Sequence, residues 1–220
     1  VYRKNVYDFD KCLYVVAYQQ DLHFRQLFKV LEKMGKPWAK DCVHVSFGMI
    51  SFEGQAFSTR KGRVVYLEDV LNQAMQKALD IINEKSPNLA NKEEVARQVG
   101  IGAVIYSDLS NGRIKDIDFS FERALNFDGE TGPYVQYTHA RCCSVLRKAE
   151  AVELPAEYDV SGLEDDEAQH LLRLLSRFPD VVKEAADKYE PSMITRAVTD
   201  IAQAYNKFYY EHRVLDAEPA

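Results

Sequence analysis

The sequence has few cysteines and no long apolar run. Four cysteines occur in 220 residues, at positions 12, 42, 142 and 143, and none belongs to a Cys-x-x-Cys pair. Two of them are adjacent, which is poor geometry for an internal disulfide. Nothing resembles a signal peptide, and no apolar stretch approaches the roughly 20 residues that a membrane-spanning helix needs. We therefore expect a cytoplasmic protein with reduced thiols and without a membrane partner.

Positive charge is also scarce. The chain has 28 Lys and Arg residues against 34 Asp and Glu residues, a net charge of -6. This balance argues against non-specific nucleic-acid binding through overall charge, so any RNA contact must come from a local basic patch. A hydrophobic content of 46% is typical of a globular protein, and 220 residues can bury one good core or two modest ones.

Two common nucleotide-binding motifs are missing. Gly54 is not followed at the required spacing by Gly-Lys-Ser or Gly-Lys-Thr, so the chain has no Walker A loop. Gly100 and Gly102 follow no predicted strand and lack a third glycine, which argues against a dinucleotide-binding motif. We interpret these two glycines as places where helices pack closely.

A strand, a helix and a second strand are predicted near the start of the chain. Residues 13–17 form an apolar run of strand length, expected to be covered on both faces. Apolar residues recur at helical spacing over residues 24–34, and Gly35 is suited to end that helix. Residues 43–49 alternate like a strand. The pattern predicts one crossover unit of an α/β sheet, in which ligands bind at the carboxyl ends of the strands.

Polar residues follow the first predicted strand. The same rule places Gln19, Gln20, Asp21 and His23 at a ligand-binding edge. The pattern is equally consistent with Asp21 as a helix N-cap and His23 as a surface residue.

A short basic loop lies after the second predicted strand. Residues 57–62 read Phe-Ser-Thr-Arg-Lys-Gly, and Arg63 follows. Lys and Arg side chains can neutralise a polyphosphate, and glycine lets the backbone approach its oxygens closely. A solvated basic loop without a ligand is the alternative.

The middle of the chain is predicted to be mainly helical. Apolar residues over 67–82 have the spacing of an amphipathic helix. Asn91, with Glu94 three residues later, is expected to cap a second helix. Asp116 and Asp118 alternate with apolar residues, and no histidine accompanies them. We interpret them as the solvated face of a short strand, not as an acid–base or metal site.

Residues 133–148 are predicted to form a helix with an RNA-binding face, and Pro133 is suited to its first position. Arginines can hold phosphates and tyrosines can stack on bases, so an aromatic and cationic face indicates RNA binding. The alternative is that the tyrosines belong to the core. Helical spacing gathers on that face Tyr134, Tyr137, Thr138, Arg141 and Lys148.

The last part of the chain is predicted to be a helical bundle. Residues 161–164 have the pattern of a capping box, and Pro179 and Pro191 are each expected to begin a new helix. Three helices with short connections would form the bundle. The aromatic residues within 205–210 are interpreted as core.

Several segments resemble arginyl-tRNA synthetases, which are class I aminoacyl-tRNA synthetases. The loop at 57–62 is similar to the family's Met-Ser-Thr-Arg-Lys-Gly signature, with Phe57 in place of Met and Ala56 where the general class I pattern has Lys. The most specific likeness is the run Gly-Glu-Thr-Gly-Pro-Tyr-Val-Gln-Tyr-Thr-His-Ala-Arg at 129–141. Further similar segments are residues 15–24, 44–49 and 99–109.

The resemblance implies a fold class and a division into domains. It implies an α/β remnant, the C-terminal part of a nucleotide-binding Rossmann-like fold, followed by a mainly α-helical anticodon-binding bundle. Residues 1–66 would hold the end of the catalytic domain, with the signature loop at 57–63. Residues 67–130 would connect it to a helical anticodon-binding domain at 131–220, which we expect to be truncated.

The resemblance also implies roles for individual residues, and it implies no protein-held metal site. The catalytic residues, which would steady pyrophosphate with the help of a Mg²⁺ ion, would be Ser58, Thr59, Arg60 and Lys61. The arginine substrate would contact Gln20. ATP would be bound by His23, His44, Phe47, Gly48, Met49, Ser58 and Lys61. The tRNA would be bound by Tyr134, Gln136, Tyr137, Arg141 and Lys148.

The activity that the resemblance implies is an arginine–tRNA ligase. Arginine attacks the α-phosphate of ATP, and the arginyl group then passes to the terminal ribose of tRNA(Arg). ATP, Mg²⁺, L-arginine and tRNA(Arg) are the expected cofactors and partners of a monomer. No His-Ile-Gly-His-like motif occurs in the 220 residues, so we expect a portion of a longer enzyme that is inactive by itself. The alternatives are a non-catalytic tRNA-binding module and another class I synthetase with a helical anticodon domain.

Overall fold

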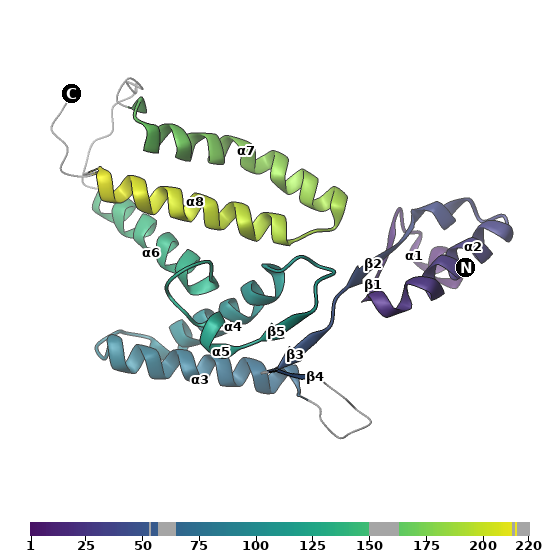
Figure 1. The fold of residues 1–220 in the computed structure, drawn as a ribbon, viewed down its shortest axis with the longest axis horizontal. Coiled ribbons are helices and arrows are strands. Elements are labelled where there is room, and N and C mark those ends of the chain that lie inside the picture. The colour runs from purple at the N-terminus through teal and green to yellow at the C-terminus, as the bar shows by residue number, and fades with distance from the viewer. Residues whose placement is uncertain (53, 57–64, 150–162, 213, 215–220) are drawn as a thin grey trace. The chain divides into compact units, whose positions relative to one another are not determined.

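The protein is described here by a computed structural model, which covers residues 1–52, 54–56, 65–149, 163–212 and 214. The chain divides into two compact units, whose elements are labelled in Figure 1. Unit 1 comprises Val1–Ala56 and Gly112–Asp118, and unit 2 comprises Phe57–Asn111 and Phe119–Ala220. Within the described residues, no helix is both long enough and apolar enough to cross a membrane.

The predicted crossover is the centre of unit 1. Strands β1 (Cys12–Ala17) and β2 (Cys42–Phe47) pair in parallel, in a register that sets Cys12 beside Cys42 and Ala17 beside Phe47. This pairing confirms the strand, helix and strand order. The other elements around this pair are α1 (Tyr2–Tyr7), the 3-10 turn η1 (Tyr18–Gln20), α2 (Asp21–Lys33) and the 3-10 turn η2 (Pro37–Asp41).

Only one face of β1 is covered. Phe24 of α2 packs against Tyr14 of β1, with ring centroids 5.1 Å apart. On the opposite face, Leu13 and Val15 are 46% and 64% exposed. The expectation that both faces are covered is therefore wrong for this chain. A two-stranded sheet with a single crossover helix buries only the face on which that helix lies.

A second, three-stranded sheet has β3 (Ile50–Phe52) between β4 (Gln55–Ala56) and β5 (Ile117–Phe119). Two carboxylates close the turns beside it. Asp116 accepts a hydrogen bond from the Met49 amide at 2.6 Å. Asp118 accepts from the Ser51 hydroxyl at 2.7 Å and from the Gly54 amide at 2.8 Å. The two aspartates are exposed, as the strand pattern predicted, but they also accept hydrogen bonds from two backbone amides.

Unit 2 is helical. Contacts join α3 to α4, α4 to α6, α6 to α8 and α7 to α8, and the last two helices run side by side (Figure 1). Its helices are α3 (Leu67–Lys85), α4 (Lys92–Leu109), α5 (Phe121–Ala124), α6 (Gly132–Ala149), α7 (Asp166–Lys188) and α8 (Ser192–Glu211).

The α3–α4 contact depends on small residues. Ala74 and Ala78 of α3 are buried, as are Ala96 and Ala103 of α4. At Gly100, an added Cβ would lie 2.6 Å from the Met75 backbone nitrogen, a distance that real Cβ atoms essentially never show. This confirms the interpretation of Gly100 as a close-packing position, because only a residue without Cβ lets the two backbones approach so closely.

Two predicted helix starts differ in the structure. Asn91 precedes α4 in a left-handed conformation (φ 56°), and its side chain makes no capping hydrogen bond. Glu94 instead accepts from Arg97 at 2.8 Å, so the predicted capping box is wrong. The proposed cap at Ser161 lies outside the described residues. The N-cap of α7 is Asp165, which accepts from the Ala168 amide at 2.9 Å.

Pro179 does not begin a helix, as the sequence had predicted, but lies inside α7. A proline in a helix interior costs about 3 kcal/mol because it removes a hydrogen bond and crowds the preceding turn. Packing against α8 offsets that cost. The buried positions of α7, Ala168 and Ala185, lie on both sides of the proline, so the helix is held on each side of it. Pro191, as predicted, stands at the start of α8.

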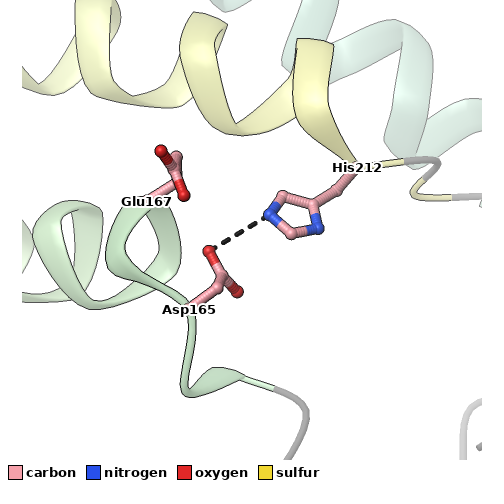
Figure 2. Close-up of side chains that lie close together, drawn as sticks. All are labelled: Asp165, Glu167 and His212. Atoms are coloured by element: carbon pink, nitrogen blue, oxygen red, sulfur yellow. Dashed lines mark hydrogen bonds and ion pairs between the residues drawn. The ribbon is translucent and has the colours of Figure 1, made fainter.

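An ion pair joins the N-terminal end of α7 to the C-terminal end of α8 (Figure 2). The His212 Nε2 lies 3.1 Å from Asp165 Oδ1. A negative charge at the first turn of one helix and an imidazole at the last turn of the other also match the two helix dipoles. The Ala168 amide, and then the charge of His212, hold the pKa of Asp165 below its usual value. Nearby, Lys207 of α8 lies 2.9 Å from Glu167 of α7.

We predict that Gly100→Ala destabilises the protein by about 1–3 kcal/mol, the usual cost of overpacking. Helix propensity alone predicts the opposite, a gain of about 1 kcal/mol on replacing glycine within a helix. Gly112→Ala is the control, because an added Cβ there meets nothing within 4 Å. Urea unfolding followed by circular dichroism separates the two effects, and a stabilised Gly100→Ala variant would contradict the close-packing argument.

The Asp165–His212 pair predicts a pH-dependent stability. Since the pKa of Asp165 is lowered by folding, its contribution is fully present above about pH 4, the unfolded-state value, and is lost as the pH falls through the folded pKa. We expect Asp165→Asn to lower the melting temperature by a few degrees at pH 7, and the difference to shrink as the pH falls below about 4. Asp180→Asn, at an exposed position of α7, is the control. A gap that stays constant from pH 7 to pH 2 would rule out the charged pair.

Candidate functional sites

The β1–β2 register brings the two predicted substrate segments to one edge of the sheet. Ala17 and Phe47 are the last paired residues, so the turn at 18–20 and the segment at 48–49 leave the sheet together. Gln20 and His23 are exposed. Phe47 and Met49 are 38% and 40% exposed. Four of the predicted ligand residues are therefore open to a ligand at this edge.

His44 occupies a different place from the other predicted ligand residues. Its side chain is only 9% exposed and stacks on the buried Phe24 ring, with centroids 4.3 Å apart. The Nε2 atom lies 2.9 Å from the Val16 carbonyl oxygen, and Nδ1 lies 3.0 Å from Asp21 Oδ1. Each ring nitrogen of His44 therefore lies close to an oxygen atom of unit 1. Asp21 is the first residue of α2 and not its N-cap, which is Gln20.

Gly48 is buried by the neighbouring chain segment. Its amide donates to the Arg113 carbonyl oxygen at 2.8 Å, and an added Cβ would clash with the Lys115 carbonyl. The Arg113 guanidinium in turn donates to the Ser46 carbonyl oxygen. Two backbone groups that could have faced a ligand, the Ser46 carbonyl and the Gly48 amide, therefore hold the segment that leads to β5. The predicted catalytic residues Ser58, Thr59, Arg60 and Lys61 lie outside the described residues.

The predicted RNA-binding helix α6 makes a polar contact with α8 in unit 2. Asn206 is the centre of this contact. Its Nδ2 donates to the Tyr134 hydroxyl at 3.0 Å and to the Thr138 hydroxyl at 2.8 Å, and its Oδ1 accepts from Arg141. No pattern in the sequence predicted a role for Asn206. A signal was available, because an amide four residues after the buried Ala202 lies on the apolar stripe of α8.

Arg141 lies between two tyrosine rings. Its guanidinium carbon is 4.9 Å from the centroid of Tyr137 and 5.0 Å from that of Tyr209. It also donates to the Tyr137 hydroxyl at 3.0 Å. Cation–π contacts of this kind favour one orientation of each ring. Tyr137 is 55% exposed, so one side of a fixed aromatic ring remains open to solvent.

The five predicted RNA-binding residues thus divide into two groups. Tyr137 and Lys148 are exposed. Tyr134 and Arg141 are half-buried against α8, and Gln136 donates to the Gln98 carbonyl oxygen of α4 at 3.1 Å. The helix itself carries three Lys and Arg residues and no Asp or Glu, in a chain whose net charge is -6. It is therefore a local basic element of the kind that an acidic protein needs in order to bind RNA.

The aromatic residues at the end of α8 also divide into half-buried and exposed side chains. Tyr205 is half-buried, and burial and a hydrogen bond with Cys142 raise its pKa to about 12. Phe208 packs on His212, with ring centroids 4.4 Å apart. Tyr210 is 85% exposed. The interpretation of these residues as core therefore holds for Tyr205 and Phe208, and is wrong for Tyr209, which is 37% exposed, and for Tyr210.

Among the described residues, one group of three side chains lies close enough to hold a metal ion. It consists of Asp165, Glu167 and His212, whose ligand atoms lie within 4.8 Å of one another (Figure 2). All three already have partners, since Asp165 binds His212 and Glu167 binds Lys207. A metal ion would have to displace those two ion pairs, so the group is better explained as a tie between helix ends.

Two family sequence models match the chain in succession. The catalytic domain of class I (R) tRNA synthetases matches residues 1–121. The DALR anticodon-binding domain matches residues 135–220.

Individual proteins agree with these matches. The arginine–tRNA ligase of Clostridioides difficile (strain 630) is 57% identical over 215 residues, which are 98% of this chain and 38% of that protein. That of Alkaliphilus metalliredigens (strain QYMF) is 54% identical, with the same shares covered. The solved arginyl-tRNA synthetase of Thermus thermophilus aligns with a TM-score of 0.81 and 34% identity, over 96% of this chain and 34% of that one.

The chain therefore spans well under half the length of the relatives that it matches. A catalytic-domain match over more than half of the chain, a following anticodon-binding-domain match and the parallel crossover of unit 1 all agree with the resemblance in the sequence. The chain belongs to the arginyl-tRNA synthetase family of class I aminoacyl-tRNA synthetases.

Proposed function

We propose that the chain takes part in the ATP-dependent attachment of L-arginine to tRNA(Arg). The arginine carboxylate attacks the α-phosphate of ATP, which gives arginyl-adenylate and pyrophosphate, and a ribose hydroxyl of the tRNA then displaces AMP. The observation that carries this proposal is the β1–β2 register, because it sets the turn at 18–20 and the segment at 47–49 at one edge. Ligands of open α/β sheets bind at this kind of edge.

We assign substrates to that edge by chemistry. Gln20 is exposed there and offers an amide that can both donate to and accept from the arginine substrate. ATP would lie against His23, Phe47 and Met49, since Phe47 and Met49 offer exposed apolar side chains that can cover a purine. Gly48 would act on this site by holding the segment between them, because its amide donates to the Arg113 carbonyl oxygen. His44 would act on this site through its neighbours, since its ring faces the interior.

The basic loop would bind the leaving group. Lys61 and Arg60 would neutralise the charge that develops on pyrophosphate, and Ser58 and Thr59 would donate hydrogen bonds to it. In the described part of unit 1, no three His, Cys, Asp or Glu side chains converge on a possible metal position. We propose Mg²⁺ as an ion that ATP brings with it.

The tRNA would lie on α6. Tyr137 offers an exposed ring for stacking, and Lys148 offers a cation for a phosphate. Tyr134, Gln136 and Arg141 would support this face while they hold α6 against α8 and α4. In this proposal residues 1–66 serve catalysis, 67–130 connect, and 131–220 bind the anticodon, in a monomer of the cytoplasm.

The 220-residue chain by itself is predicted to catalyse no ATP–pyrophosphate exchange, with or without tRNA(Arg). Class I synthetases bind ATP partly through a His-Ile-Gly-His-like motif, and no such run occurs in this sequence. The assay measures radiolabelled pyrophosphate incorporated into ATP, with a full-length arginine–tRNA ligase as the positive control. Exchange above the level of the Lys61→Ala variant would contradict the prediction.

The α6 surface predicts two different effects on tRNA affinity. Tyr137→Ala is expected to weaken binding at least about fivefold, the low end of the effect of removing a stacked base. Lys148→Ala is expected to lower the slope of log affinity against log salt concentration by about 1, since one phosphate contact is lost. Filter binding of tRNA(Arg) at several salt concentrations measures both.

Two variants serve as matched controls. Tyr137→Phe keeps the ring and should keep most of the affinity, and Lys183→Ala removes an exposed lysine of α7 without changing the salt slope. If Lys183→Ala and Lys148→Ala lower the slope equally, RNA binding does not depend on the α6 face.

A further inference from the structure

Asn206 of α8 directs both the nitrogen and the oxygen of its side-chain amide at helix α6. Its Nδ2 donates to the Tyr134 hydroxyl at 3.0 Å and to the Thr138 hydroxyl at 2.8 Å, and its Oδ1 accepts from the Arg141 guanidinium. A guanidinium can only donate hydrogen bonds, so the amide oxygen must face Arg141. Both N–H groups then face the two hydroxyls, and the three partners together fix the orientation of the amide.

The two hydroxyls are suited to accept from Asn206. The Thr138 hydroxyl donates its own proton to the Tyr134 carbonyl oxygen at 3.0 Å, so its oxygen lone pairs remain for Asn206. Thr138 is 6% exposed, and Tyr134 and Asn206 are half-buried. A polar network whose members are satisfied in such a place makes its surroundings rigid. The contact between α6 and α8 is therefore a fixed point within unit 2.

Arg141 connects Asn206 to an exposed ring. One of its terminal nitrogens donates to Asn206 Oδ1, and the other donates to the Tyr137 hydroxyl at 3.0 Å. Its guanidinium carbon lies 4.9 Å from the centroid of Tyr137 and 5.0 Å from that of Tyr209, which follows Asn206 on α8. Tyr137 is 55% exposed and is the ring to which the proposed function assigns base stacking. The orientation of this ring therefore depends on α8 as well as on its own helix.

We propose that Asn206 is a positioning residue of the tRNA-binding face. It holds Arg141, and Arg141 in turn holds the Tyr137 ring in the orientation in which a base can stack on it. Binding then requires less ordering of the ring, so Asn206 raises the affinity without a contact to the RNA. The RNA part of this proposal rests on the proposed function, but the hold of Asn206 on Arg141 does not.

The hold on Arg141 is tested by nitrogen-15 NMR of the arginine side chains in the 220-residue chain. Rotation about the Nε–Cζ bond averages the two terminal nitrogens of a free guanidinium into one signal, whereas a held guanidinium gives two. We expect two signals for Arg141 in the unchanged chain and in Asn206→Asp, which keeps an acceptor for it. Asn206→Leu, which keeps the branching of the side chain without its polar atoms, should give one. A single signal in the unchanged chain, or two in Asn206→Leu, would overturn the proposal.

Two further variants accompany this measurement. Asn206→Ala is studied beside Asn206→Leu, because the larger leucine side chain can also push α6 away from α8, and it should likewise give one Arg141 signal. Gln203→Leu makes the same change from an amide to leucine at an exposed position of α8, and it should keep both signals. Circular dichroism verifies that each variant keeps its helices. Loss of the second signal in Gln203→Leu would mean that the signals do not report on Asn206.

The effect on RNA is tested by filter binding of tRNA(Arg) in a double-mutant cycle. Asn206→Leu should weaken binding about two- to tenfold, the cost of ordering one side chain. The slope of log affinity against log salt concentration should stay unchanged, since no phosphate contact is lost. In the Tyr137→Ala background the same substitution should have no further effect, because the ring through which Asn206 acts is gone. A residue that only stabilises the fold would weaken binding equally in both backgrounds.

The outcomes separate this proposal from the function on which it partly rests. Equal weakening by Asn206→Leu with and without the Tyr137 ring, or a lower salt slope, contradicts the positioning role. If Tyr137→Ala itself leaves the affinity unchanged, the assignment of the α6 face to tRNA fails, and the RNA part of the proposal fails with it. Two Arg141 signals that depend on Asn206 would still confirm the hold in that case.

Discussion

The hydrogen bonds between the parallel strands β1 and β2 are the constraint on which the proposed substrate edge depends. They set Ala17 beside Phe47, and two segments far apart in sequence therefore leave the sheet at the same place. The strands alone do not fix the turn that follows. The ring of His44 on β2 lies beside both ends of that turn, 2.9 Å from the Val16 carbonyl oxygen and 3.0 Å from Asp21 Oδ1.

Helix α6 has features of both roles that its sequence pattern had presented as alternatives. Tyr134 and Arg141 pack against α8 through Asn206, which is the behaviour expected of core residues. Tyr137 remains exposed, with Arg141 against its ring. A rigid ring loses little freedom when a base stacks on it, so packing on one side can prepare binding on the other.

Two glycines and three aspartates of this chain make close contacts with the backbone. Gly48 and Gly100 both lie where another backbone segment would clash with a Cβ atom. Asp116, Asp118 and Asp165 all accept hydrogen bonds from backbone amides. These residue types also occur in nucleotide and metal sites, and their partners show which role they have here.

Local patterns in the sequence were sufficient for the strand, helix and strand order, the helices α3, α4, α6 and α8, the close packing at Gly100 and the family. The spacing of apolar residues and the presence of turn-forming residues are properties of neighbouring positions in the sequence. The family likeness extends along nearly the whole chain. Tertiary structure decided what those patterns leave open. Four features depend on contacts, or on a lack of contacts, with segments distant in sequence. They are the continuation of α7 through Pro179, the exposed face of β1, the contacts of Asn206 with α6, and the inward-facing ring of His44. Burial and hydrogen-bond partners outweigh local preference at those positions, so a single stretch of sequence does not reveal them.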